Sequence, residues 1–152
     1  MKHILSAAFI LLTAFALQFC TMQPATEVAD QETILDAYWV LVSLEGQSFP
    51  EPRDSRMAYI RLQENEDDII GFGGCNKFKG KYSLTETSLR LSELSATRMT
   101  CPGMETETKL LDALSTTTAY KLSGRVLTLY AGNTAVATFR AGNPDEIGPD
   151  VR

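Results

Sequence analysis

Few residues of this chain could carry nucleophilic or redox chemistry. It contains three cysteines, Cys20, Cys75 and Cys101, and a single histidine, His3. A thiol or hydroxyl nucleophile needs a nearby base or cation to activate it, and the sequence offers no imidazole after residue 3. The composition therefore argues against a reactive cysteine, a Ser-His-Asp triad and a histidine-containing zinc site.

The pair Cys75 and Cys101 leaves two interpretations open. In an oxidising compartment the two cysteines are expected to form a disulfide, which would stabilise the fold by about 3.5 kcal/mol in the chain-entropy model. The alternative is two buried free thiols that pack as small apolar side chains. Which interpretation holds depends on where the protein resides, and that depends on the N-terminal segment.

Residues 1–19 have the pattern of a signal peptide. Lys2 and His3 precede an apolar run from Ile4 to Leu17 that contains no acidic residue. This run of about 14 residues is too short for a permanent membrane-spanning helix. We therefore expect an exported protein, found in the bacterial periplasm or at the outer membrane.

Two processing routes remain open for this segment. The four residues that end at Cys20, Leu-Gln-Phe-Cys, resemble a bacterial lipobox, in which the cysteine becomes a lipidated N-terminus. Cleavage after Ala16 would instead release a soluble periplasmic or secreted protein. Residues 20–36 are predominantly polar and suit a flexible tether. The first route predicts contact with a membrane surface through a lipid on Cys20.

Charge and composition exclude further classes of protein. The net charge is −5 and no long run of Lys or Arg occurs, so we expect no nucleic-acid partner. The glycines around Gly73 lack the complete dinucleotide or P-loop pattern, and the acidic run 64–68 lacks the glycine of a calcium loop. We expect no cofactor and no metal.

Carboxylates are the one remaining source of catalytic groups. Glu105 and Glu107 stand two residues apart on a predicted helix, so their side chains point in different directions. A facing acid and nucleophile is therefore not expected from this pair. We predict no catalytic residues and treat a carboxylate-dependent hydrolase as the weakest alternative function.

The periodicity predicts a mostly β (α+β) domain, either a small lipocalin-like antiparallel β-barrel or a strongly twisted sheet, with one helix. The helix is expected to begin at Pro102 and to bury Leu110, Leu111 and Leu114. The C-terminal residues 142–152 are predicted to be disordered. The strands are expected at residues 38–44, 57–62, 69–73, 77–82, 89–91, 119–122, 125–130 and 134–139.

Three lysines alternate with other residues on one predicted strand. Lys77, Lys79 and Lys81 share one strand face, and Arg90 could stand beside them across a hairpin. Such a patch could face anionic lipid or polymer. The alternative is a solvated face or a lysine-protected sheet edge.

Three aromatic residues also have two interpretations. Trp39, Phe72 and Tyr82 could form a platform for a ligand. Their position in apolar strand patterns instead favours aromatic side chains of the core. We expect the core role.

A series of residues resembles the META (HslJ-like) domain family. The resemblance covers about residues 37–141 and implies the lipocalin-like fold with one helix, often in exported proteins, with no established catalytic reaction. Gly74 and Asn76 are expected to adopt special backbone angles, and Gly80 to leave room beside Phe78 and Tyr82. The series comprises Trp39, Leu41, Gly46, Gly74, Cys75, Asn76, Phe78, Gly80, Tyr82, Leu94, Ser95, Thr97, Met99, Cys101, Glu105, Leu127 and Leu129.

The sequence thus predicts a non-enzymatic exported protein of the cell envelope, acting in envelope maintenance or stress tolerance. The expected organisation is a signal peptide (1–19), a tether (20–36), the folded domain (37–141) and a tail (142–152). An alternative function is a binding module, which holds a small apolar ligand in its barrel mouth or inhibits a partner enzyme.

Overall fold

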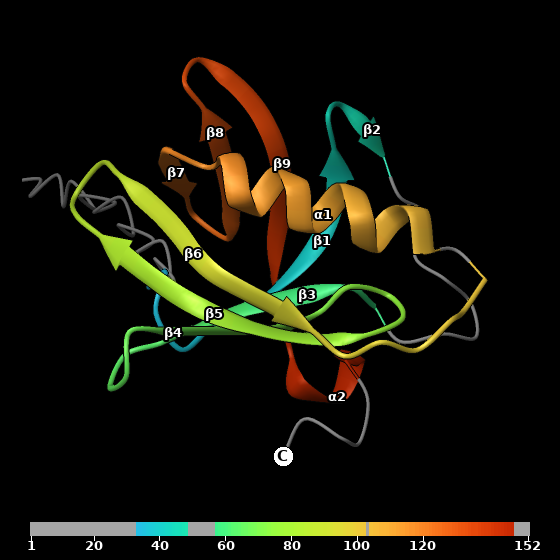
Figure 1. Cartoon of the computed structure of the whole chain (residues 1–152). Coiled ribbons are helices and arrows are strands. Elements are labelled where there is room, and N and C mark those ends of the chain that lie inside the picture. Colours follow the sequence, from blue (N-terminus) through green and yellow to red (C-terminus); the bar gives the residue numbers. More distant parts are fainter. Residues whose placement is uncertain (1–32, 49–56, 103, 148–152) are drawn as a thin grey trace, which may run out of the picture.

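The computed structural model describes residues 33–48, 57–102 and 104–147, which form a curled antiparallel sheet with a helix on its concave side (Figure 1). The predicted mostly β class with one long helix is confirmed. The helices are α1 (Met104–Thr116) and the short α2 (Pro144–Ile147). The strands are β1 (Tyr38–Leu44), β2 (Gln47–Ser48), β3 (Tyr59–Gln63), β4 (Asp68–Phe72), β5 (Lys77–Leu84), β6 (Leu89–Ala96), β7 (Ala119–Ser123), β8 (Val126–Ala131) and β9 (Thr134–Gly142).

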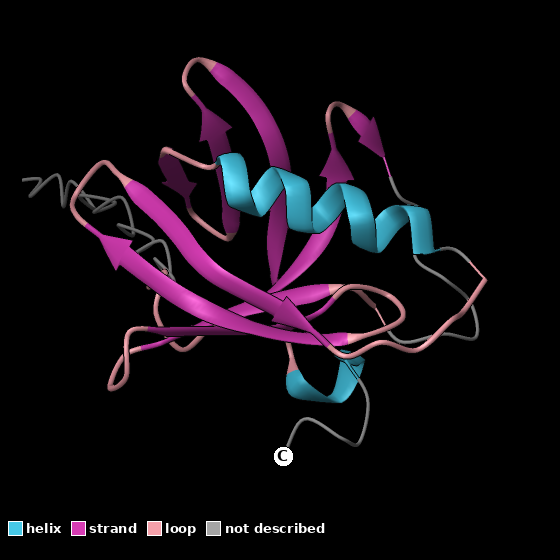
Figure 2. Ribbon diagram, viewed as in Figure 1, coloured by secondary structure: helices cyan, strands magenta, loops and turns pink. Residues whose placement is uncertain are grey.

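The sheet forms a half-barrel. Its strand order is β6-β5-β4-β3-β1-β9-β8-β7, and β2 adds to β1 as a short hairpin arm. Strands β6 and β7 are the two edges, and α1 crosses the sheet between them (Figure 2). The first strand of the domain therefore lies in the middle of the sheet, where it pairs with β3 and with the last strand, β9.

The main core fills the concave side of the sheet. Leu110 and Leu114 of α1 are fully buried against strand residues such as Trp39 and Phe139. This confirms the predicted apolar face of the helix at Leu110 and Leu114, whereas Leu111 is only partly buried. The helix begins at Met104 rather than at Pro102, which places Glu105 and Glu107 in its first turn, where the helix dipole favours carboxylates.

A second apolar cluster covers the convex side. Val40, Tyr59 and Phe72 pack there against Ile147 of α2, which is 0% exposed. β1 sends Trp39 to one face and Val40 to the other, which explains its continuous apolar sequence. The expected disorder from residue 142 is therefore not found up to residue 147, because Ile147 covers apolar sheet surface.

The described end of the expected tether also belongs to the folded unit. Ile34 is buried in the main core, and its carbonyl oxygen accepts a hydrogen bond from Trp39 Nε1 at 3.0 Å. The Asp36 amide donates to the Leu62 carbonyl oxygen at 2.7 Å. The domain thus begins several residues before the predicted boundary at residue 37.

The hairpin of β5 and β6 is longer than predicted and contains an irregularity. The register shifts between Lys79 and Lys81, so Gly80 lies where β6 bulges. A Cβ on Gly80 would lie 2.7 Å from the Ser92 carbonyl oxygen. Gly80 therefore makes room for the neighbouring strand β6, whereas the expectation placed this room beside Phe78 and Tyr82.

Candidate functional site

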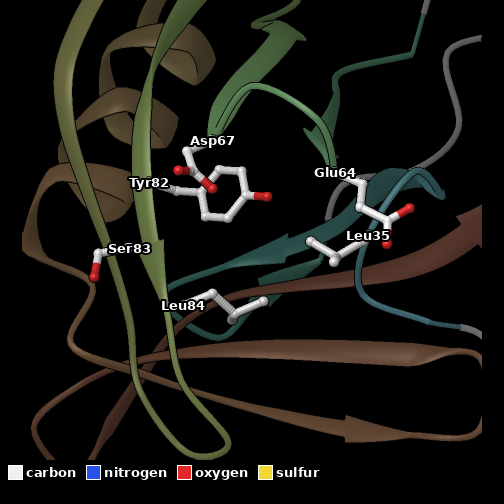
Figure 3. A pocket seen from close by; sticks show the side chains of 6 residues that line it. All are labelled: Leu35, Glu64, Asp67, Tyr82, Ser83 and Leu84. Atoms are coloured by element: carbon white, nitrogen blue, oxygen red, sulfur yellow. The ribbon is translucent and has the colours of Figure 1, made fainter.

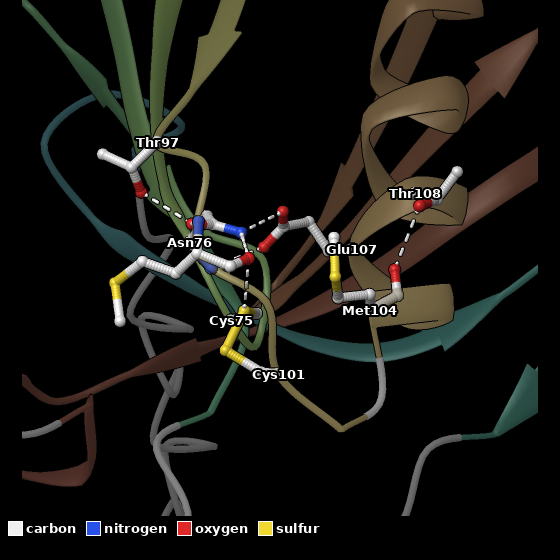
Figure 4. The surroundings of a disulfide bond; sticks show 8 residues. Cys75, Asn76, Thr97, Cys101, Met104, Glu107 and Thr108 are labelled. Carbon is white, nitrogen blue, oxygen red and sulfur yellow. Dashed lines mark hydrogen bonds between the residues drawn. A yellow bond between two sulfur atoms is a disulfide. The ribbon is translucent and has the colours of Figure 1, made fainter.

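A disulfide joins the turn after β4 to the segment after β6. The sulfur atoms of Cys75 and Cys101 are 2.04 Å apart, and their Cα atoms are separated by 5.8 Å (Figure 4). The predicted disulfide is confirmed, and the alternative of two free thiols is wrong. Both cysteines in the described part of the chain are consumed by this bridge.

Asn76, next to the disulfide, uses every hydrogen-bonding position of its side-chain amide. Its Oδ1 accepts from the Met99 amide at 2.7 Å and from Thr97 Oγ1 at 2.9 Å. Its Nδ2 donates to the Met99 carbonyl oxygen at 3.1 Å and to Glu107 Oε1 at 2.8 Å. The amide is 1% exposed, so these four partners replace the water that it loses on folding.

Glu107 completes this arrangement from the first turn of α1. Its carboxylate is buried, at 5% exposure, and also accepts a hydrogen bond from the Asn76 backbone amide at 2.5 Å. A Cβ on Gly73 would lie 2.5 Å from Glu107 Cγ, so only glycine allows this close approach. The hydrogen bonds of the buried Glu107 carboxylate thus hold the start of α1 against the turn after β4.

We call this group of residues the clasp. It joins three segments that are distant in the sequence, namely the turn after β4, the segment after β6 and the start of α1 (Figure 4). Its polar groups bind one another, so its chemistry is used for structure. The clasp consists of Gly73, Cys75, Asn76, Thr97, Met99, Cys101 and Glu107.

The clasp explains much of the motif found in the sequence. Gly74 has a φ of +106°, as expected for a special backbone angle. Asn76 does not have a positive φ, so the expectation of a special backbone angle at this residue is wrong. The turn uses its side chain, which bridges two other segments. Phe78 and Tyr82 of the motif are core residues.

Glu105 and Glu107 have different environments, as their spacing indicated. Glu105 is exposed, and its Oε1 lies 2.8 Å from Lys109 Nζ. A hydrogen bond from Lys109 and its charge lower the pKa of the Glu105 carboxyl. The two carboxylates do not form a facing catalytic pair. The sequence does not reveal the partner of Glu107, which lies 31 residues away, although a glutamate in the first turn of a predicted helix is a visible feature.

The lysines of β5 lie on the convex face, together with Arg90. Lys77, Lys79 and Lys81 are exposed while the intervening residues are buried, and Ser83, on the lysine face, pairs with Arg90. Lys81 forms an ion pair with Asp68, and its ammonium donates to the Glu66 carbonyl oxygen at 3.1 Å.

Acidic neighbours reduce the positive potential of this face. The hydrogen bond to Asp68 is the main cause that raises the pKa of Lys81, and the charges of Asp68, Glu66 and Glu93 add to it. Nearby Arg61 is paired with Asp36 at 3.1 Å and lies over the Tyr38 ring. The expected lysine face therefore exists, but carboxylates balance part of its charge.

An open hollow of about 510 Å³ lies at the C-terminal end of β5, beside Tyr82 and opposite to the clasp (Figure 3). Burial is the largest cause that raises the pKa of the Tyr82 phenol, followed by the charges of Asp67, Asp36, Glu64 and Asp68. The Tyr82 hydroxyl donates to the Gln63 carbonyl oxygen at 2.9 Å. The hollow is lined by Leu35, Glu64, Asp67, Tyr82, Ser83 and Leu84.

The aromatic trio does not form a joint platform. Trp39 is buried in the concave core, and Phe72 lies in the convex cluster. Tyr82 belongs to the concave core and also lines the hollow. This supports the expected core role. Of the three aromatic residues, Tyr82 is the one that a ligand in the hollow could contact.

Other candidate groups are limited. Across residues 33–48, 57–102 and 104–147, no cluster of His, Cys, Asp and Glu could hold a metal ion. No helix in this part of the chain is long and apolar enough to cross a membrane. Cys20, residues 1–19 and the two processing sites lie outside the described residues.

Comparison with known families identifies the domain. The sequence profile of the META domain matches residues 32–143, which is most of the chain. The chain belongs to the META domain family. The matched range includes Ile34, in agreement with a domain that starts before residue 37. No curated protein sequence matches the chain.

Solved structures share the fold. An NMR structure of a protein from Burkholderia xenovorans is 25% identical, with a TM-score of 0.59, and the match covers 94% of this chain and 99% of that one. A second NMR structure is 24% identical, with a TM-score of 0.57 and coverage of 72% and 95%. A DUF4847 family protein from Bacteroides vulgatus is 14% identical, with a TM-score of 0.52 and coverage of 74% and 96%.

Proposed function

We propose that this META-domain chain is a non-enzymatic envelope protein that acts outside the cytoplasm, held at a membrane by a lipid on Cys20, in envelope maintenance or stress tolerance. The observation that carries the proposal is the disulfide between Cys75 and Cys101. Cys75 and Cys101 form a bridge, which is typical of an oxidising compartment, so Cys20 is the one remaining thiol of the sequence.

The chemistry of the clasp supports the non-enzymatic part of the proposal. An activated nucleophile needs a neighbouring base, and the two clasp cysteines are bridged while Asn76 and Glu107 bind each other. Ser83 at the hollow has no imidazole to activate it, since His3 is the sole histidine. These observations support a domain that serves as a scaffold and acts through contacts of its surface.

The binding-module alternative has one specific observation in its favour, the hollow beside Tyr82. Its rim carries Glu64 and Asp67, and its apolar lining is limited to Leu35 and Leu84 beside the Tyr82 ring. A polar or cationic ligand suits this lining better than the small apolar ligand first expected. Helix α1 fills the concave side where a barrel ligand would sit. A native mass spectrum that shows a co-purified small molecule would support this alternative.

Metabolic labelling with palmitate tests the main proposal. We expect label on the wild-type chain in the membrane fraction and none on Cys20→Ala. The double variant Cys75→Ser, Cys101→Ser is the matched control, because it also removes cysteines but keeps the lipidation site. Unlabelled wild-type protein in the soluble fraction would refute the lipid anchor.

A further inference from the structure

Met99 is the most exposed large apolar residue in the described part of the chain. It is 62% exposed, in the segment between β6 and Cys101. Met104, at the start of α1, is 38% exposed, and Met57 is partly buried against the convex cluster. The three methionines of the folded part thus offer their thioethers to solvent to very different degrees.

The clasp holds the backbone of Met99 in place. The Met99 amide and carbonyl both bind the buried Asn76 side chain, at 2.7 Å and 3.1 Å. Two residues later the disulfide attaches the segment covalently, and Cys75 Sγ lies 3.4 Å from the Met99 carbonyl oxygen. The side chain of Met99 belongs to neither apolar cluster, so its exposure is a property of an anchored segment.

The chemistry of the surrounding sulfur atoms favours a thioether as the site of attack by an oxidant. A free thiolate would react first, but both cysteines of the described residues are already disulfide-bonded. An exposed methionine sulfur can attack one oxygen of a hydroperoxide, which forms the S–O bond as the O–O bond breaks. The sulfur loses two electrons and becomes a sulfoxide, and the peroxide is reduced to water or an alcohol after proton transfer.

We propose that Met99 is a surface modification site, at which hydroperoxides form methionine sulfoxide while the domain stays folded. The polar sulfoxide needs no buried hydrogen-bond partner there, because the side chain projects into water. The same oxidation at Met57 would place a polar group against the convex cluster. This reactivity does not depend on the envelope role proposed above.

A time course with hydrogen peroxide on the native protein tests the proposal. After oxidation the peroxide is removed, the protein is unfolded, and its disulfide is reduced and alkylated. Digestion with trypsin then releases the peptides 57–61 and 99–109. Fragmentation of the second peptide separates oxidation at Met99 from oxidation at Met104. We expect Met99 to react first, Met104 next and Met57 several-fold more slowly than Met99.

Four companion measurements separate this site from general damage. The thermal unfolding midpoint is expected to stay unchanged when Met99 alone is oxidised, and methionine sulfoxide reductase is expected to restore the original mass. In urea, where the hydrogen bonds of the clasp are lost, the three methionines should react at similar rates. Met99→Leu should remove the fastest reaction and leave the rates at Met104 and Met57 unchanged.

Two outcomes would overturn the proposal. One is equal oxidation rates at Met99 and Met57 in the folded protein. The other is loss of the cooperative unfolding transition as the Met99 sulfoxide forms. Both are measured on the wild-type protein, so the test does not require the Met99→Leu variant to fold.

Discussion

The two ends of β5 differ in how their polar groups are satisfied. At the Lys77 end, the clasp buries an amide and a carboxylate that bind each other, beside a covalent bridge. At the Tyr82 end, the carboxylates of Glu64 and Asp67 line an open hollow and make no ion pair with the residues that the structure describes. The first end can contribute much to stability, whereas the second leaves charge available for contacts with other molecules.

This difference bears on what the family motif means. Gly74, Cys75, Asn76, Thr97, Met99 and Cys101 of the motif gather at the clasp, and Tyr82 is the motif residue that lines the hollow. A motif that contains cysteine and asparagine invites a search for a catalytic site. Here its polar members hold three segments together, so membership of the family predicts the scaffold better than it predicts a ligand.

The largest expected effect is the loss of the disulfide. The double variant Cys75→Ser, Cys101→Ser should lower the free energy of unfolding by about 3.5 kcal/mol, because the bridge closes a loop with a sequence separation of 26 residues. Urea unfolding measures this difference. Cys20→Ser is the matched control and should leave the unfolding free energy unchanged. Equal stability of the double variant and the wild type would show that the bridge does not constrain the unfolded chain.

The next effect is the loss of the Asn76 side chain. Asn76→Ala should lower the free energy of unfolding by about 3 kcal/mol, because Glu107 and the Met99 backbone lose partners in a buried site. The control is Glu64→Gln at the hollow, which should change stability by less than about 0.5 kcal/mol. Similar losses in both variants, measured by urea unfolding, would remove the distinction between the two ends of β5.

The smallest effect concerns Tyr82 at the hollow. Tyr82→Phe removes the hydrogen bond to the Gln63 carbonyl oxygen and should lower the free energy of unfolding by about 1 kcal/mol.

A dependence on pH should accompany this loss. The pKa of Tyr82 is raised above its ordinary value of 10.0, so the folded protein keeps the phenol proton where the unfolded chain loses it. Stability should therefore fall as the pH rises from about 10 through the folded pKa. Lys81, whose pKa is also raised, contributes in the same direction in wild type and Tyr82→Phe.

The free energy of unfolding is measured by chemical unfolding of both proteins at a series of alkaline pH values. The difference between the two pH profiles gives the contribution of the Tyr82 phenol. Identical slopes in the two proteins would mean that neither burial nor the surrounding carboxylates raise the pKa of Tyr82.

Local sequence patterns predicted most of the secondary structure. The alternation of β5 separates its exposed lysines from Phe78 and Tyr82, because successive side chains of a strand point to opposite faces. The leucine spacing of α1 likewise identifies its buried face. The domain boundaries were predicted too narrowly, since Ile34 and Ile147 join the domain through contacts with distant strands.

The candidate site was predicted only in part. Cys75 and Cys101 could be paired from the sequence, because they are the two cysteines that follow the apolar N-terminal segment. The role of Asn76 could not be predicted, because its partners lie 21 to 31 residues away and meet it through the fold. The hollow has the same origin, since Leu35, Glu64 and Tyr82 come from separate elements.

By itself the sequence determined which reactive groups the protein contains and which local structure its segments form. It gives no histidine after residue 3, two cysteines suited to a bridge, strands by their alternation and a helix by its spacing. The tertiary structure decided that Glu107 pairs with Asn76, that α1 fills the half-barrel and that Met99 remains exposed on an anchored segment. The physical reason is that hydrogen bonds and burial depend on which distant segments meet, whereas periodicity depends only on neighbours along the chain.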